Sequence, residues 1–334
     1  MILILIFGFL FGATLQFSGL NRYNTISGMS MLKNLTMAKA IAIAIGLGII
    51  LVNAEIMLGF ASYHIKPLLL GGIILGGILF GFAMSVLGYC PGTIPVSMGE
   101  GSIDAFVGFL GAVVAGILYS LFVPYISDIT GPDLGKGAMS SLFRDRSLIF
   151  FIVVLITGAA LIYAAFFLNR YDKDYTYRWL VSGIGIAIIT AGIFLTSVFD
   201  RVLGASTFYP YIGGVLAGLA DNEYFKSSVT SGKWEMFFLL GAFLSGLILS
   251  LVRGDFKLTL IHENWSRYKN HSGTSRIIWA FAGGFLLITG ARLAGGCTSG
   301  HIISGGVQLA LSSWIFAAVV FGSFLLTGRF FYKR

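Results

Sequence analysis

The segment from Gly290 to His301 reads G-A-R-L-A-G-G-C-T-S-G-H and comes directly after a long apolar run. It contains four glycines, an arginine, a histidine and one of the two cysteines of the chain. A bilayer tolerates irregular backbone only where protein or an internal cavity covers it. The segment therefore predicts a helix break inside a membrane protein, with polar side chains grouped at the break.

The other cysteine lies in a similar segment, Val86–Thr93, which reads V-L-G-Y-C-P-G-T. When Cys90 is aligned with Cys297, glycines and serines on both sides of the cysteines also align. The matched positions are Gly76-Gly77 with Gly283-Gly284, Gly88 with Gly295, Ser97 with Ser304, and Gly99 with Gly306. The shared pattern indicates one structural device that is used twice.

The composition sets the class of protein. The chain has 334 residues, of which 57% are hydrophobic and 11% charged, and its mean hydropathy is +0.89. A soluble domain carries about 25% charged residues, so we predict an all-α polytopic membrane protein. The net charge of +8 does not indicate nucleic acid, because the basic residues, Lys66 and Arg276 among them, lie in short segments between apolar runs and read as topology signals.

Nine spans and one shorter re-entrant segment are expected. The run 206–220 is interrupted by Pro210 and by glycines, so it predicts a re-entrant half-helix. The first run, Met1 to Leu15, lacks a basic start and a small-residue cleavage site, which favours a retained span. The predicted spans are 2–20, 37–60, 66–88, 103–126, 147–168, 178–199, 234–252, 275–295 and 307–331.

The distribution of basic residues predicts the orientation. Nine spans place the two chain ends on opposite sides of the membrane. The C-terminus carries Arg329, Lys333 and Arg334, whereas the first run carries no basic residue. The positive-inside rule then places the N-terminus outside and the C-terminus in the cytoplasm. The break at Cys90 is expected to open from the inside and the break at Cys297 from the outside.

Similar breaks that enter from opposite faces are typical of inverted repeats that share a site near the midplane. We expect one membrane domain, 1–334, with pseudo-repeat halves 1–126 and 178–331 joined by a linker span, 147–168. A weaker echo extends the pattern to four breaks of similar spacing. The corresponding residues at these breaks are Asn21, Cys90, Ser206 and Cys297.

The residues around the breaks favour a small anion. Pro91 is a favoured first helical residue and Thr298 a good N-cap, so each cysteine is expected at the start of a short helix. Such an end offers free N–H groups and a positive dipole, and Arg292 adds a charge within the membrane. The predicted substrate-binding residues are Asn21, Gly88, Cys90, Gly92, Ser206, Arg292, Gly296, Cys297, Thr298, Gly300 and His301.

Other interpretations of these residues stay open. A free cysteine is often only a buried small residue, Arg292 can pair with a carboxylate, and His301 can be a loop residue at the outer mouth. A cysteine activated at a helix N-terminus can instead take up sulfur as a persulfide, which would make the protein a membrane sulfurtransferase. Two cysteines are too few for a typical zinc site, and no metal, cofactor or nucleic-acid partner is expected.

The segment Gly290–His301, with the Ile302–Gly305 sequence that follows, resembles the signature of the YeeE/YedE family of bacterial sulfur-compound transporters. The segment Gly88–Thr93 is similar to its first-half counterpart, and the resemblance covers essentially the whole chain. It implies an hourglass-shaped permease of the bacterial inner membrane, not an enzyme, that imports thiosulfate or a similar sulfur oxyanion. It also implies that Cys90 and Cys297 form the waist of the hourglass.

One position departs from the family pattern. Thiosulfate-transporting members often carry a third cysteine near the first break, where this chain has Asn21. An asparagine can donate hydrogen bonds to an anion but cannot exchange sulfur, so the substrate stays open between thiosulfate and other sulfur or selenium anions. The resemblance also implies a small soluble sulfur-carrier protein as a partner on the cytoplasmic side, besides the lipid bilayer.

Overall fold

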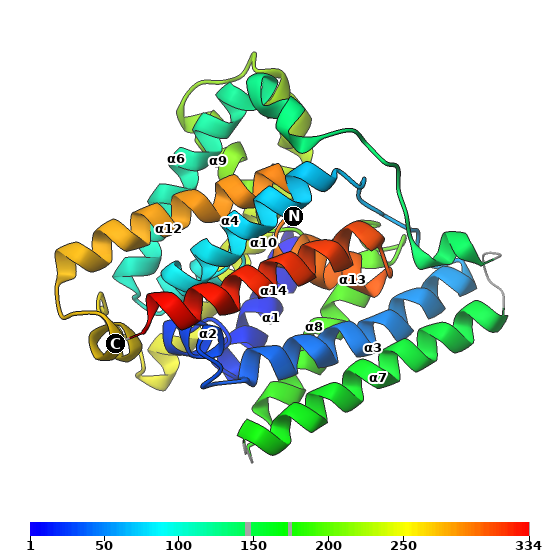
Figure 1. The fold of residues 1–334 in the computed structure, drawn as a ribbon, viewed down its shortest axis with the longest axis horizontal. Coiled ribbons are helices and arrows are strands. Elements are labelled where there is room, and N and C mark those ends of the chain that lie inside the picture. The colour runs from blue at the N-terminus through cyan, green and yellow to red at the C-terminus, as the bar shows by residue number, and fades with distance from the viewer. Residues whose placement is uncertain (144–147, 173–175, 334) are drawn as a thin grey trace.

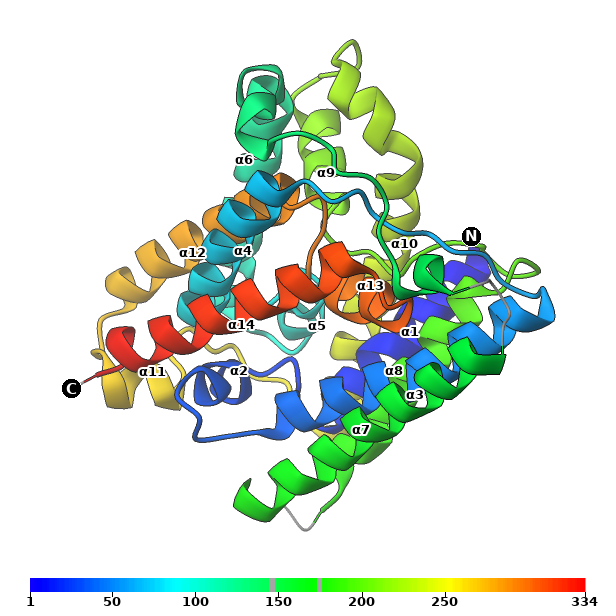
Figure 2. The ribbon, with the colours of Figure 1, turned by 45° about the vertical axis from the view of Figure 1, so that its right-hand side comes forward.

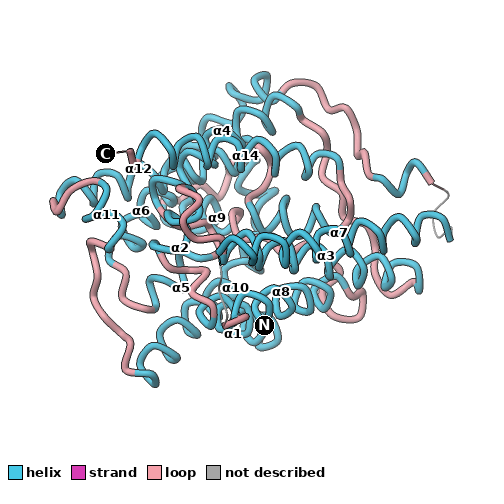
Figure 3. Tube along the Cα trace, turned by 60° about the horizontal axis from the view of Figure 1, so that its bottom comes forward, coloured by secondary structure: helices cyan, strands magenta, loops and turns pink. Residues whose placement is uncertain are grey.

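The computed structural model describes residues 1–143, 148–172 and 176–333. Within these residues every regular element is helical, as predicted (Figure 3). Residue 147, with which the predicted linker span begins, and Arg334 lie outside the described residues.

Each of the nine predicted spans coincides with a long helix. Seven of the helices are long and apolar enough to cross a membrane, whereas α1 and α8, with 16 and 17 residues, are shorter. The long helices are α1 (Ile2–Phe17), α3 (Thr36–Leu58), α4 (Leu70–Leu87), α6 (Ile103–Ile126), α7 (Leu148–Asp172), α8 (Arg178–Phe194), α10 (Glu223–Arg253), α12 (Gly273–Leu293) and α14 (Leu311–Phe331). The protein is therefore a multi-pass membrane protein.

The largest boundary difference is at α10, which begins at Glu223 instead of residue 234. The side chain of Asn222 caps this end by accepting a hydrogen bond from the backbone N–H of Phe225 at 2.9 Å. A side-chain cap satisfies a free N–H group at a helix start. The polar first turns are therefore helical although they lie outside the apolar run.

Short helices follow the long ones at the breaks. The re-entrant segment predicted at 206–220 coincides with α9. The short elements at the breaks are α2 (Tyr23–Ser30), α5 (Thr93–Gly99), α9 (Phe208–Leu216), and the π-helical turn η3 (Thr298–Ile303) with α13 (Ser304–Val307). Three further short elements lie in loops, namely η1 (Ser127–Thr130), η2 (Met139–Leu142) and α11 (Glu263–Tyr268).

The chain thus repeats one order of elements four times, a long helix, a short helix and a long helix. The four units are α1–α2–α3, α4–α5–α6, α8–α9–α10 and α12–η3/α13–α14. Helix α7 belongs to none of them and lies at the edge of the molecule alongside α3 (Figure 1). The same order in 1–126 and 178–331 is compatible with two repeat halves, and that division stays a prediction.

The four units pack against one another through their long helices. The first helix of one unit packs against the last helix of another, so that α1 contacts α10, α8 contacts α3, α4 contacts α14, and α12 contacts α6. The short helices reach across these pairs, with α5 against α10, α9 against α6, α13 against α3, and α2 against α14. Figure 2 shows α5 and α13 near the middle of the molecule, surrounded by long helices. The breaks are therefore held inside the bundle.

Two faces can be defined from the helix ends. Beside the end of α14, the hydroxyl of Tyr332 lies 2.6 Å from that of Tyr23, and it donates to the carbonyl of Ser85 at 2.9 Å. The loops that follow α1, α4, α7, α10 and α14 form the C-terminal face, and the loops that follow α3, α6, α8 and α12 form the N-terminal face. Cys90 follows α4 and Cys297 follows α12, so the two cysteine breaks begin from opposite faces.

Helices α4 and α12, which lead into the two cysteine breaks, touch at the backbone. A Cβ atom on Gly76 would lie 2.5 Å from the carbonyl oxygen of Gly290, and a Cβ on Gly290 would lie 2.6 Å from that of Gly76. Small residues allow membrane helices to approach this closely. The pair therefore fixes the distance between the two helices.

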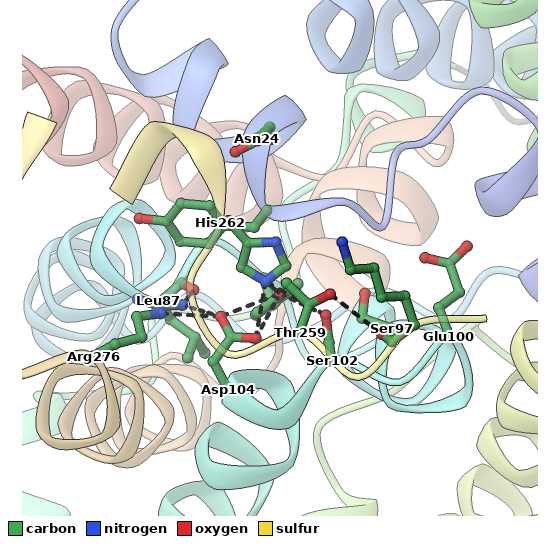
Figure 4. A network of polar contacts seen from close by, with 12 residues as sticks. Asn24, Leu87, Ser97, Glu100, Ser102, Asp104, Thr259, His262 and Arg276 are labelled. Carbon is green, nitrogen blue, oxygen red and sulfur yellow. Dashed lines mark hydrogen bonds and ion pairs between the residues drawn. The ribbon is translucent and has the colours of Figure 1, made fainter. Parts of the chain in front are cut away.

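A buried ion pair holds the end of α4 (Figure 4). Arg276 and Asp104 are both fully buried, and the guanidinium donates two hydrogen bonds to Asp104 Oδ2, at 3.0 and 2.6 Å. It also donates to the carbonyls of Val86 and Leu87, at 3.1 and 2.6 Å. Arg276 thus satisfies carbonyls that the end of α4 leaves free. The prediction that it is a topology signal between spans was wrong, because it lies inside α12.

The same carboxylate holds the residue before Cys90. The hydroxyl of Tyr89 lies 3.2 and 3.3 Å from the two oxygens of Asp104. The Nε2 atom of His262 lies 3.0 Å from the Tyr89 hydroxyl and 3.0 Å from Asp104 Oδ1. Gly88 has a left-handed backbone with φ +78°, which glycine adopts without strain. The network therefore fixes the direction in which the chain leaves α4.

We expect Gly76→Ala to lower stability by about 1–3 kcal/mol, because the new methyl group must push α12 away from α4. The thermal unfolding midpoint of the purified protein in detergent measures this. Gly322→Ala on α14 is the matched control, since a Cβ there meets nothing within 4 Å and should leave the midpoint unchanged. Equal midpoints for the two variants would contradict the close packing.

Asp104→Asn should cost about 3–5 kcal/mol of stability, because it leaves the buried Arg276 guanidinium without its carboxylate. Tyr89→Phe removes only hydroxyl contacts and should cost about 1 kcal/mol. The double variant Asp104→Asn/Arg276→Met removes both charges and should be more stable than Asp104→Asn alone. Unfolding midpoints in detergent compare the three proteins, and a double variant no more stable than the single one would refute the ion-pair account.

Candidate functional site

Cys90 lies in the turn that precedes α5 and is 8% exposed. Its backbone N–H donates to Thr93 Oγ1 at 2.8 Å, and its carbonyl accepts from the backbone N–H groups of Thr93 and Ile94, at 3.0 and 3.1 Å. The helix therefore begins at Thr93 and not at Pro91, because this turn precedes it. The expectation that Cys90 directly precedes the first helical residue was therefore wrong, because Gly92 is the N-cap of this helix.

Cys297 directly precedes η3 and is 1% exposed. Its sulfur lies 3.1 Å from the hydroxyl oxygen of Ser299. Its carbonyl accepts from the backbone N–H of His301 at 2.8 Å. Single π-helical turns of this kind are frequent at functional sites. The expectation of Thr298 as the N-cap was wrong, because Cys297 itself takes that position and Thr298 is the first residue of η3.

The two cysteine breaks meet inside the protein. Cys90 lies beside Thr298, which follows Cys297 in the chain. A cavity of about 40 Å³ lies at this contact, lined among others by Cys90, Gly92 and Thr298 and by the ring of Phe11. A water molecule takes up about 30 Å³ in the liquid, so the two breaks enclose little free space in this structure.

Arg292 and Ser206, two of the predicted substrate-binding residues, are in direct contact. The Nη1 atom of Arg292 donates to Ser206 Oγ at 3.2 Å and to Thr207 Oγ1 at 3.1 Å, and its Nε atom donates to the Tyr224 hydroxyl at 2.7 Å. All three partners are neutral hydroxyls. Within the described residues Arg292 forms no direct ion pair, although the carboxylate of Glu235 lies near enough to act on its charge.

Glu235 is a buried residue of this site that the sequence analysis did not single out. Its carboxylate accepts from the backbone N–H groups of Thr207 and Phe208 at 2.6 and 2.9 Å, and the residue is 3% exposed. The start of α9 is therefore occupied by the protein's own carboxylate. The available signal was an acidic residue within the apolar run of α10.

Lys66 is the second residue that the sequence analysis missed as part of the site. Its ammonium group donates to the carbonyl of Gly295 at 2.6 Å. It fills the place that a Cβ atom of Gly296 would take and lies 3.0 Å from the Cβ position of Gly300. The predicted glycines at 296 and 300 thus make room for this lysine, which also interacts electrostatically with Cys297.

His301 is fully buried and both of its ring nitrogens are engaged. Its Nε2 atom lies 2.8 Å from the carbonyl oxygen of Ala294, and its Nδ1 atom lies 3.0 Å from Ser313 Oγ. Because a carbonyl only accepts, Nε2 carries the proton and Nδ1 accepts from the Ser313 hydroxyl. The ring therefore fastens the Cys297 loop to α14 in this state.

Asn21 is fully buried beside the C-terminal end of α5. Its Nδ2 atom donates to Glu100 Oε2 at 2.8 Å, and its carbonyl accepts from Ser97 Oγ at 2.6 Å. Its Oδ1 atom has no partner among the described residues. The predicted residues thus form three groups, Cys90 with the Cys297 loop, Arg292 with Ser206, and Asn21 with the end of α5.

Comparisons with known proteins agree with the sequence motifs. A family model described as sulphur transport matches residues 23–326, which include both cysteine breaks. The thiosulfate transporter TsuA of Spirochaeta thermophila is 26% identical over 326 residues, which cover 93% of each protein. Because the family model matches most of its length, this chain belongs to the sulphur transport (YeeE/YedE) family.

Proposed function

We propose that this protein imports thiosulfate, or a similar small sulfur oxyanion, through a constriction lined by Cys90 and Cys297. The family supports a sulfur-compound transporter, and one relative is named a thiosulfate transporter. The observation that carries the proposal is the pair of cations at the Cys297 loop, because neither Lys66 nor Arg292 forms an ion pair within the described residues.

The proposed route begins at the N-terminal face, which we place outside the bacterial inner membrane by the positive-inside rule. There Lys66 and Arg292 attract the anion, since fixed charges at a mouth raise the local concentration of counter-ions. The anion then passes Cys297 and reaches the contact between Cys90 and Thr298. It leaves past the C-terminal face, which is cytoplasmic in this orientation.

Soft contacts at the waist suit conduction. A thiol is a weak S–H donor, so Cys90 and Cys297 can hold a sulfur oxyanion without binding it too firmly to release it. Gly88 and Gly92 allow close approach of the backbone. The cavity of about 40 Å³ beside Cys90 is small for such an anion, so in this proposal the breaks move each time an anion passes.

The alternative of a membrane sulfurtransferase needs a group that activates a cysteine. His301, four residues after Cys297, has both nitrogens engaged with Ala294 and Ser313, so it does not act as a base on that thiol here. A persulfide trapped on Cys297 after exposure to thiosulfate, without uptake into liposomes, would favour the enzyme. A sulfur-carrier protein on the cytoplasmic side remains a proposed partner that would accept the product.

The direct test is uptake of labelled thiosulfate by the purified protein in liposomes, with sulfite and selenite as competitors. Cys90→Ala and Cys297→Ala should each reduce uptake by about tenfold or more, because a lost hydrogen bond to a charged group costs about 1.5–3 kcal/mol. The corresponding serine variants keep a donor and should retain part of the activity. If the alanine variants instead fail to fold, both cysteines return to a packing role.

The loop lysine gives a pH-dependent prediction. Burial lowers the pKa of Lys66 to about 8, so its ammonium group is charged below that pH and neutral above it. Uptake should fall as the outer pH rises through 8, because the attraction for the anion is lost. Lys66→Arg keeps its charge and should give a flat profile between pH 7 and 9.

The matched control for this profile is Lys136→Met, which removes an exposed lysine from the same face. It should leave both the uptake rate and its pH dependence unchanged, whereas Lys66→Met should be slow at every pH. A wild-type profile that stays flat through pH 8 would show that Lys66 does not supply the attraction.

A further inference from the structure

A second positively charged site lies at the C-terminal face. A cavity of about 440 Å³ is lined there by Arg22, Arg178 and Arg253, with Asp255 as the acidic residue of the lining. The arginines come from three elements, the residue before α2, the first residue of α8 and the last residue of α10. The fold therefore gathers them from positions far apart in the sequence.

The charge of this cavity is not balanced. Three guanidinium groups face one carboxylate, which leaves two positive charges in excess. Within the described residues, none of these side chains forms an ion pair with another residue. Guanidinium groups bind oxyanions through paired N–H donors. The lining thus suits an oxyanion that carries two negative charges.

Two residues of the same lining also carry buried polar atoms without hydrogen-bond partners. Gln16 is 4% exposed and its Oε1 atom has no hydrogen-bond partner among the described residues, and the same holds for Ser18 Oγ. Both residues line the cavity. Buried polar atoms are nearly always paired, so an unpaired one points to a bound molecule or water.

The cavity adjoins the first break. Gly19, two residues before Asn21, is part of its lining. Arg22 and Asp255 also line a neighbouring cavity of about 300 Å³, whose wall includes Glu100 and His262 beside the Cys90 break (Figure 4). The arginine cavity therefore lies beside the first break, at the C-terminal face.

We propose that the arginine cavity is a second binding site for the transported doubly charged sulfur oxyanion, on the side opposite to Lys66 and Arg292. This inference rests on the proposed transport function for the identity of the anion. The site holds the anion after the constriction and before release, so it sets how readily the anion leaves. The phosphate of an anionic lipid shares the same chemistry and is the competing occupant.

The test uses the variant Cys90→Ala/Cys297→Ala, which removes the thiol contacts at the constriction. Thiosulfate is titrated calorimetrically into this purified protein in detergent, and saturable binding is expected. Adding Arg178→Gln and Arg253→Gln should weaken binding about tenfold or more, because two charge-assisted contacts are lost. Asp255→Asn should strengthen it, since the lining loses its negative charge.

Arg170→Gln is the matched control, because it removes an exposed arginine near the end of α7 on the same face and should leave binding unchanged. Opposite effects of the arginine and aspartate changes separate a binding role from a purely structural one. An affinity that is unchanged by the loss of both arginines would overturn the site. Occupation by phosphatidylglycerol in mixed micelles that thiosulfate fails to displace would also overturn it in favour of a lipid.

Uptake by the wild-type protein in liposomes is measured separately. Thiosulfate binding at the arginines without any uptake would contradict the proposed transport function and keep the binding site. Normal uptake with no arginine-dependent binding would keep the transport function and remove the second site. The two proposals therefore fail in different ways.

Discussion

The constraint on which this structure depends is that a helix broken within a membrane must find partners for the carbonyls at the break. At the end of α4, Arg276 binds the carbonyls of Val86 and Leu87. At the end of α12, Lys66 binds the carbonyl of Gly295. The solution is reciprocal, because Arg276 lies near the start of α12 and Lys66 lies just before α4. Each helix that leads into a cysteine break is thus completed by a cation from beside the start of the other.

Arg276 and Lys66 differ in whether a carboxylate pairs with them. This difference distinguishes a structural role for Arg276 from a proposed substrate-attracting role for Lys66. Arg276 is paired with Asp104, so the end of α4 is nearly neutral and serves to hold the Cys90 turn. Lys66 has no such carboxylate among the described residues, and Arg292 is bound only by hydroxyls. The carboxylate of Glu235 acts on both cations without pairing directly with either, so positive charge is in excess near the Cys297 loop. Such an excess suits the proposed passage of an anion that must enter readily and leave again.

The sequence predicted the features that depend on local patterns of residues, namely the long helices and the breaks between them. Apolar runs located the nine long helices, and glycine-rich interruptions located the breaks. It could not predict Lys66, Glu235 or the role of Arg276, because their partners are set by the packing of distant segments. Lys66 and Gly295 are 229 residues apart, and Arg276 and Asp104 are 172 apart. In sequence both cations resemble ordinary topology signals, so only the fold shows that they complete broken helices.

Asn21 shows how a departure from the family pattern fits this arrangement. Its amide donates to Glu100, whose carboxylate also lines the cavity beside the Cys90 break. A thiol at this position is a weaker donor than an amide and would hold the carboxylate less firmly. A free carboxylate there would repel an anion that leaves the constriction. The amide of Asn21 therefore holds the Glu100 carboxylate in a way that a thiol would not. This supports the proposal of a constriction with two thiols, beside which Asn21 keeps a negative charge in place.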